Sequence, residues 1–246
     1  MSGQTPGNQK LIISHAVLAG LTPLIPIPIV DDIVRTYFVR RLVRMLAANR
    51  NCPLTPDDVR VLADAPESGC LGGCLLTALL IPFKLIFRKI FFFLEWKRAV
   101  DTVSRIVYQG YLVDAALEAG WCAPGGPRSA MEVRAAIDDV LKNLDTRLLE
   151  RSIKGVFSQS KSVLKGAAGM LERSLRGRSK RASREQIEQA VEAVEHAEER
   201  EIEGVAAQVE NALRSLPPGH FNRLRSELAA RLGLGIQDEG NNNPVN

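Results

Sequence analysis

Two long uncharged segments mark the first half of the chain. Residues 11–30 and residues 68–83 contain no formally charged side chain. Twenty apolar residues match the thickness of a bilayer core, whereas the sixteen residues of the second segment are too few for a usual span. Because prolines interrupt the second half of the first segment, we expect a helix over about residues 9–21, a bent connector, and a new helix from Asp31.

The connector between these two helices combines prolines with two acids. The residues that define it are Pro23, Pro26, Pro28, Asp31 and Asp32. The two carboxylates can cap the second helix and complement its dipole, which explains them more simply than acid–base chemistry does. Two interpretations of the resulting helical hairpin stay open. It inserts into a membrane, or it is buried in the core of a soluble protein.

The second helix of the hairpin is rich in arginine. Residues 31–50 hold five arginines and two acids, a net charge of +3. Such a helix beside an apolar hairpin suits an anionic lipid surface. The alternative is a solvated arginine face that packs on carboxylates elsewhere in the chain.

Apolar blocks separated by single cations follow over residues 68–94, where four of the eight phenylalanines lie within seven positions. Long cationic side chains can reach solvent while their neighbours stay in hydrocarbon, so we expect an interfacial or re-entrant helix. A deeply buried helix with its cations at the rim is the alternative. The lipid-contacting residues predicted from the two basic segments are Arg40, Arg41, Arg44, Lys84, Phe87, Arg88, Lys89, Phe91 and Phe92.

The clearest break in the chain is a run rich in glycine and proline at residues 121–127. It divides an apolar and basic helical domain, residues 10–120, from a helical interaction module, residues 128–234. The polar ends, residues 1–9 and 235–246, are predicted to be flexible tails. No run shows strand alternation, so the expected fold class is all-α: an apolar helical hairpin, amphipathic helices and a C-terminal helical module.

Local signals mark where several helices begin. Thr55 precedes a proline and two acids, which is typical of a helix start. Ser129 and Ser183 each open a capping-box pattern. Apolar positions from Val133 to Leu148 then follow helical spacing on one face.

Charge is segregated in the second half. Residues 151–184 hold ten bases and one acid, and residues 185–210 hold nine acids and one arginine. The two blocks can pair with each other, or the basic block can bind acidic phospholipid or nucleic acid. Nucleic acid is the less favoured partner, because no aromatic residue lies within the basic cluster at 176–184 and no recognition motif is present. The helix at 183–216 is the segment expected to bind a protein partner or a second copy.

No catalytic, cofactor-binding or metal-binding pattern is recognisable. The chain has no phosphate-binding loop, dinucleotide fingerprint or nucleophile elbow, and its three histidines are isolated in sequence. Cys70 and Cys74 form a poor zinc site; they can carry lipid, but inert buried thiols explain them more simply. Four cysteines and a polar start predict a cytoplasmic protein with free thiols, at the cytoplasmic face of a membrane.

The Pro-x-Pro element at residues 25–28, followed by Val30-Asp31-Asp32 and the arginines at 40–44, resembles uncharacterised bacterial helical proteins with such an element before an arginine-rich helix. The resemblance covers about forty of the 246 residues and implies no activity. The leading hypothesis is therefore a non-enzymatic, membrane-associated anchor or adaptor without cofactors. A soluble helical scaffold with a buried hairpin is the second hypothesis. An enzyme with a site assembled from distant residues is the third, and it predicts a polar pocket with perturbed titrating groups.

Overall fold

A computed structural model describes residues 6–24, 30–64, 88–176 and 184–234. The helices are α1 (Pro6–Gly20), α2 (Val30–Asn49), α3 (Pro56–Ala63), α5 (Arg88–Glu118), α6 (Ala130–Asn143), α7 (Arg147–Gln159), α8 (Lys161–Arg176), α9 (Arg184–Arg214) and α10 (His220–Arg231), with a short 3-10 turn, η1 (Thr22–Leu24). No strand occurs in these ranges, so the expected all-α fold class is confirmed.

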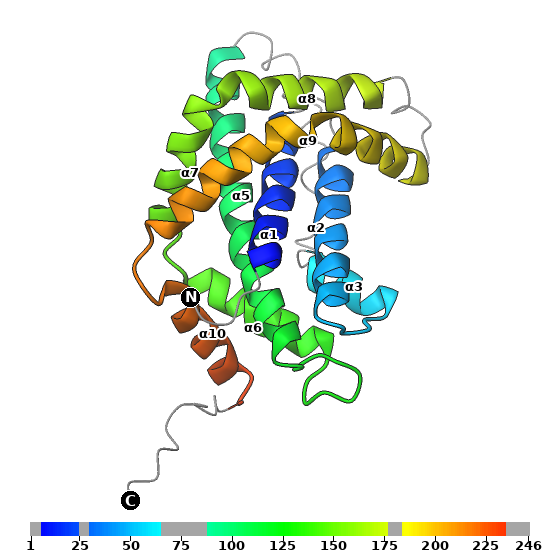
Figure 1. Cartoon of the computed structure of the whole chain (residues 1–246), viewed down its shortest axis with the longest axis vertical. Helices are drawn as coiled ribbons and strands as arrows, with labels where there is room; N and C mark the ends of the chain where they lie inside the picture. Colours follow the sequence, from blue (N-terminus) through cyan, green and yellow to red (C-terminus); the bar gives the residue numbers. More distant parts are fainter. Residues whose placement is uncertain (1–5, 25–29, 65–87, 177–183, 235–246) are drawn as a thin grey trace, which may run out of the picture.

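The apolar helix α1 lies in the middle of the molecule. It runs between α5 and α2, and α9 crosses it (Figure 1). Ile12, Ile13, Ala16 and Val17 are completely buried. A helix that is covered on several faces must be apolar nearly all round, which explains the uncharged sequence of this segment. These side chains contact protein, as the buried-hairpin alternative expects.

Helix α5 comes very close to α1. A Cβ atom on Gly110 would lie 2.8 Å from Cγ2 of Ile12, and one on Gly20 would lie 2.2 Å from Cγ2 of Val103. Glycine at both positions therefore allows the two backbones to approach each other. From Val103 to Leu117 almost every side chain of α5 is buried, because α1, α2, α6, α7 and α10 surround it.

The two predicted domains share one hydrophobic core. Helix α9 packs on α1, α7 packs on α5, and α6 packs on α3. Buried apolar side chains from α1 through to α10 form one continuous cluster. Residues 121–127 do form a loop, with Gly120 and Gly125 in left-handed conformations, but the helices on its two sides are packed together.

The helix starts predicted at Thr55 and Ser129 are confirmed. In each case the side-chain oxygen accepts from the backbone N–H three residues on, and the acid at that position accepts from the cap residue. The expected helix over residues 133–148 is instead divided, because α6 ends at Asn143 and α7 begins at Arg147. The capping pattern at Ser183 lies outside the described residues.

Candidate functional site

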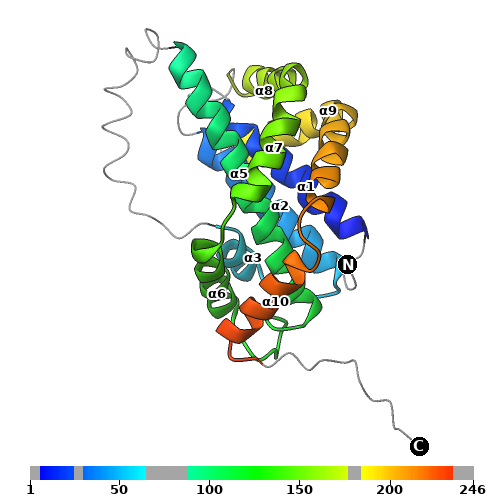
Figure 2. The ribbon, with the colours of Figure 1, turned by 90° about the vertical axis from the view of Figure 1, so that its left-hand side faces the viewer.

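An exposed basic surface extends over α7, α8 and the beginning of α5, which lie together at one end of the molecule (Figure 2). Its cations, all exposed, are Lys97, Arg98, Arg147, Arg151, Lys154, Lys161, Lys165 and Arg173. The acids on the same stretches, Glu95, Asp101, Glu150 and Glu172, are only partly exposed. We call these eight cations and the helical faces that carry them the basic surface. Its outward charge is strongly positive because the cations are at the surface and the acids are set deeper.

The amphipathic sequences of α7 and α8 produce this arrangement. Leu149, Ile153 and Phe157 recur at helical spacing and are completely buried, which turns the cations of α7 outward. Helix α8 buries Leu164 and Leu171 in the same way. Its outer face also carries Gly166 and Gly169, whose surroundings are open, so the backbone is accessible between the cations.

Exposed apolar side chains lie among the cations. Leu94, Leu148 and Met170 are 46%, 50% and 40% exposed. Each lies three residues before an exposed cation, namely Lys97, Arg151 and Arg173. Residues three apart on a helix share a face, so each apolar side chain lies beside a positive charge.

A groove of about 450 Å³ separates α5 from α7 within this surface. Its residues are Trp96, Lys97, Val100, Asp101, Arg147, Glu150, Arg151 and Lys154. Trp96 and Val100 are buried and form its apolar floor. The Trp96 ring packs edge-on against Phe157, with centroids 5.8 Å apart, and the ammonium of Lys161 lies 6.0 Å from the Trp96 centroid.

The carboxylates of Asp101 and Glu150 both line this groove. Burial raises the pKa of Asp101, the nearby charge of Glu150 raises it further, and Lys97 opposes both effects. The Thr146 hydroxyl donates to Glu150. At the same end, hydrogen bonds from Arg147 lower the pKa of Asp145 to about 2, so this surface pair keeps its charges at neutral pH.

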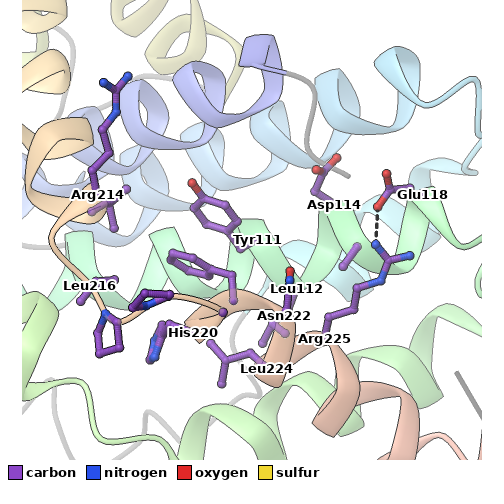
Figure 3. A pocket seen from close by; sticks show the side chains of 16 residues that line it. Tyr111, Leu112, Asp114, Glu118, Arg214, Leu216, His220, Asn222, Leu224 and Arg225 are labelled. Atoms are coloured by element: carbon purple, nitrogen blue, oxygen red, sulfur yellow. Dashed lines mark hydrogen bonds and ion pairs between the residues drawn. The ribbon is translucent and has the colours of Figure 1, made fainter. Parts of the chain in front are cut away.

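A second cavity, of about 320 Å³, lies between α5, α10 and the turn after α9 (Figure 3). Tyr111 stacks on Phe221, with ring centroids 4.0 Å apart, and the His220 ring nitrogen Nε2 lies 3.2 Å from the Tyr108 hydroxyl. The Tyr111 hydroxyl is buried and has no hydrogen-bond partner within the described part of the chain. Burial raises the pKa of Tyr111 above its usual range, so this phenol stays protonated.

One wall of the second cavity is an ionic network that joins four helices. Arg50 donates from Nε and Nη2 to the two carboxylate oxygens of Asp114, at 2.8 Å each. Glu118 accepts from Arg50 at 3.2 Å and from Arg225 at 2.7 Å, and Asn8 donates to Asp114 at 2.7 Å. These charges compensate one another, so the network holds α1, α2, α5 and α10 together.

The arginines predicted to bind lipid on α2 have partners within the protein. Arg40 makes a bidentate ion pair with Asp64, and Arg41 donates to the Tyr37 hydroxyl at 2.9 Å. The guanidinium of Arg41 also lies 3.7 Å from Glu192 of α9. Of these three arginines only Arg44 is exposed, and its Nε lies 3.4 Å from the Arg40 carbonyl oxygen. The α2 arginines therefore match the alternative in which they pack on carboxylates elsewhere, and the head-group role of Arg40 and Arg41 stays a prediction.

The remaining predicted site residues are placed only in part. Pro23 lies in η1, and Asp32 pairs with Arg35 at 2.8 Å. Lys84, Phe87, Pro26, Pro28, Cys70 and Cys74 lie outside the described residues, as do the side chains of Asp31, Arg88, Lys89, Phe91 and Phe92. Two acids of the 185–210 block, Glu192 and Glu203, face Arg41 and Lys10 of the N-terminal helices.

The groove between α5 and α7 was not predicted from the sequence. The run Trp96-Lys97-Arg98 was visible as the start of an amphipathic helix, but no local pattern links it to Glu150 and Lys154, more than fifty positions away. An aromatic side chain next to two cations is the signal that could have marked one wall of the groove. Its other wall depends on the packing of α7.

Comparisons with protein-family models, with curated proteins and with solved structures found no match for this chain. Among the helices that the structure describes, none combines the length and apolarity needed to cross a membrane. The same residues contain no cluster of three or more side chains suited to hold a metal ion.

Proposed function

We propose that this is a non-enzymatic, peripheral membrane-binding protein that acts as an anchor or adaptor on acidic phospholipid. The observation that carries the proposal is the basic surface, where exposed apolar side chains lie beside exposed cations on the outer faces of three helices. Cations provide attraction to anionic head groups, and Leu94, Leu148 and Met170 can enter the boundary between head groups and acyl chains. Nucleic acid would use the cations but would leave these aliphatic side chains without a role.

The expected strength suits reversible attachment. A lysine or arginine near an anionic surface contributes about 1 kcal/mol, so four simultaneous contacts would contribute about 4 kcal/mol before any apolar insertion. This attraction falls with ionic strength, because exposed charges are screened. We place the membrane contact on α5, α7 and α8. The apolar side chains of α1 and the arginines of α2 contact protein instead.

A helical scaffold without a membrane role is the second candidate function. The burial of α1 favours it, because the apolar hairpin segment is used as core. In that case the basic surface would bind an acidic protein, or α9 would bind a partner or a second copy. Binding to lipid vesicles separates the two candidates.

Charge reversal tests the location of the contact. We expect the triple variant Arg151→Glu, Lys154→Glu and Lys165→Glu to bind vesicles of phosphatidylcholine and phosphatidylglycerol at least about 100-fold more weakly, because the loss of three attractions of about 1 kcal/mol alone has this effect and the new acids add repulsion. Cosedimentation at low and high salt measures this. The matched control is Arg60→Glu, Lys142→Glu and Arg223→Glu, which changes the net charge equally at exposed sites on α3, α6 and α10.

The control decides how the result is interpreted. Full binding by the control variant supports the basic surface as the contact. Equal loss in both variants would mean that binding follows net charge and has no defined site. Failure of the unmodified protein to bind any vesicle would contradict the membrane role, and comparable binding to duplex DNA would favour nucleic acid.

Arg40→Glu is expected to lower stability, measured by urea unfolding, because it leaves Asp64 beside a like charge.

A further inference from the structure

We propose that the groove between α5 and α7 binds a primary amine joined through two carbons to a phosphate, the chemistry of a phosphoethanolamine head group of a membrane lipid. The inference rests on the proposed function, since it names the lipid that the basic surface would select. Three features of the groove support it: the order of charges along it, its two partly buried carboxylates and the position of exposed Leu94.

The groove has an acidic end and a basic end. Trp96 of α5 packs against Phe157 near the end of α7, whereas Asp101 is close enough to Glu150, near the start of α7, for their charges to interact. The two helices therefore run in opposite directions along the groove. Lys97 and Lys154 lie toward the Trp96 end, and the two carboxylates lie toward the other end.

The cation at the acidic end, Arg147, donates its guanidinium hydrogen bonds to Asp145, and it makes none to Asp101 or Glu150. Within the described residues the Asp101 carboxylate accepts no hydrogen bond and forms no ion pair, although it is partly buried. Glu150 accepts from the Thr146 hydroxyl, which brings no positive charge. Two partly buried carboxylates that repel each other are stabilised by a cation between them. A ligand ammonium would supply that charge and donate hydrogen bonds to both.

The same carboxylates distinguish a primary amine from a quaternary one. A primary ammonium donates up to three hydrogen bonds, whereas a trimethylammonium donates none and is usually held by several aromatic rings. Trp96 is the only aromatic residue among those lining this groove, and Lys161 already lies over its ring. Ethanolamine therefore fits better than choline.

The basic end fits a phosphate. The ammonium groups of Lys97 and Lys154 make no hydrogen bond and no close ion pair within the described residues, and Arg151 lies beside them on the same groove. Lys97 and Asp101 are four residues apart, about 6 Å along a helix, which is the scale of a two-carbon link between phosphate and amine. Leu94 lies a further three residues toward the start of α5 and is 46% exposed, where the acyl chains would begin.

The first experiment compares two kinds of vesicle that contain the same fraction of anionic lipid. Phosphatidylethanolamine replaces phosphatidylcholine while phosphatidylglycerol is held constant. We expect about ten-fold tighter binding of the full chain, because charge-assisted hydrogen bonds to two carboxylates are gained. The double variant Asp101→Asn with Glu150→Gln should lose this preference without weaker binding to phosphatidylglycerol. The matched control, Asp32→Asn with Asp57→Asn, removes two exposed carboxylates elsewhere and should keep the preference.

A fluorescence measurement follows the groove directly. The chain has two tryptophans, so Trp121→Phe leaves Trp96 as the only reporter. Vesicles with phosphatidylethanolamine should change the Trp96 emission in a saturable way, and vesicles with phosphatidylcholine should change it much less. Soluble phosphoethanolamine and phosphocholine, added alone, provide the same comparison without a membrane.

The outcomes separate this inference from the proposed function. Binding to phosphatidylglycerol without any ethanolamine preference would overturn the inference and leave the membrane role. A preference that survives in Asp101→Asn with Glu150→Gln would also overturn it. A Trp96 response to soluble phosphoethanolamine without vesicle binding would assign a free phosphoamine in place of a lipid. Absence of both responses would overturn the inference and the proposed function together.

Discussion

At the scale of single residues, buried polar side chains connect segments that are far apart in the sequence. Gln109 of α5 donates from Nε2 to the carbonyls of Leu62 and Ala63, at 3.0 Å and 3.2 Å. Arg134 of α6 donates to the Leu62 carbonyl at 2.8 Å. The last carbonyls of a helix have no partners within that helix, so both side chains stabilise the end of α3. They also fix α3 against α5 and α6.

Buried His15 should make stability depend on pH. Its Nδ1 lies 3.0 Å from the Leu11 carbonyl oxygen, and burial lowers its pKa from 6.5 to about 4. The unfolded chain therefore binds a proton below pH 6.5, and the folded protein does so only near pH 4. The free energy of unfolding should fall as the pH decreases from 6.5 to 4, by about 2 kcal/mol at pH 5 from this residue. Urea unfolding at pH 7 and pH 5 measures it.

His15→Gln is the comparison for this prediction, because other groups also titrate in this range. The difference between the variant and the unmodified protein should shrink at low pH by the amount assigned to His15. His220→Gln serves as the control, since His220 is only partly buried and its pKa is lowered less markedly. An unfolding free energy that depends on pH in the same way with and without His15 would contradict the assignment.

At the scale of elements, the contact between α1 and α5 sets the position of both. An alanine Cβ at position 110 would lie 2.8 Å and 3.2 Å from two Ile12 carbons and 3.3 Å from Cδ2 of Leu42. Alanine normally favours a helix over glycine, but here the helices would have to separate. Gly110→Ala should therefore destabilise the protein by about 1–3 kcal/mol in urea unfolding.

Gly166→Ala on α8 is the matched control for this substitution, because a Cβ there meets open space. It should raise stability by about 0.5–1 kcal/mol through helix propensity alone. Both substitutions replace glycine by alanine, and they should change the free energy of unfolding in opposite directions. Stabilisation by both would mean that the approach of α1 to α5 is looser than these distances indicate.

At the scale of the whole molecule, both halves of the sequence are needed for one core and for the proposed groove. Trp96 precedes the loop at 121–127, and Phe157 and Glu150 follow it. The full chain should unfold in one cooperative transition, because the buried cluster runs from α1 to α10. Calorimetry and far-UV circular dichroism should report the same midpoint.

Separated fragments test this shared core. Residues 1–127 and residues 128–246, expressed alone, should each lack the dispersed amide spectrum of a folded protein, because each leaves its half of the core exposed. The mixture of the two fragments is the control and should recover helical structure. Independent folding of either fragment would support the two domains expected from the loop at 121–127.

The sequence by itself determined the helical class and the features that depend on neighbouring positions. The caps at Thr55 and Ser129 were predictable because their hydrogen bonds span three residues. The spacing of apolar residues likewise showed which faces of α7 and α8 are buried. It did not show that the helix is divided near residue 144 into α6 and α7. The apolar spacing continued through this break to Leu148, which is exposed.

Only the tertiary structure decided what covers each face. The uncharged segment at 11–21 was compatible with lipid and with protein, because both exclude water and favour the same side chains. Packing by α5, α2 and α9 assigns it to the core. Packing likewise pairs Arg40 with Asp64 and brings Trp96 next to Phe157. Such pairs join distant positions, and a local pattern fixes the direction of a side chain but not its partner.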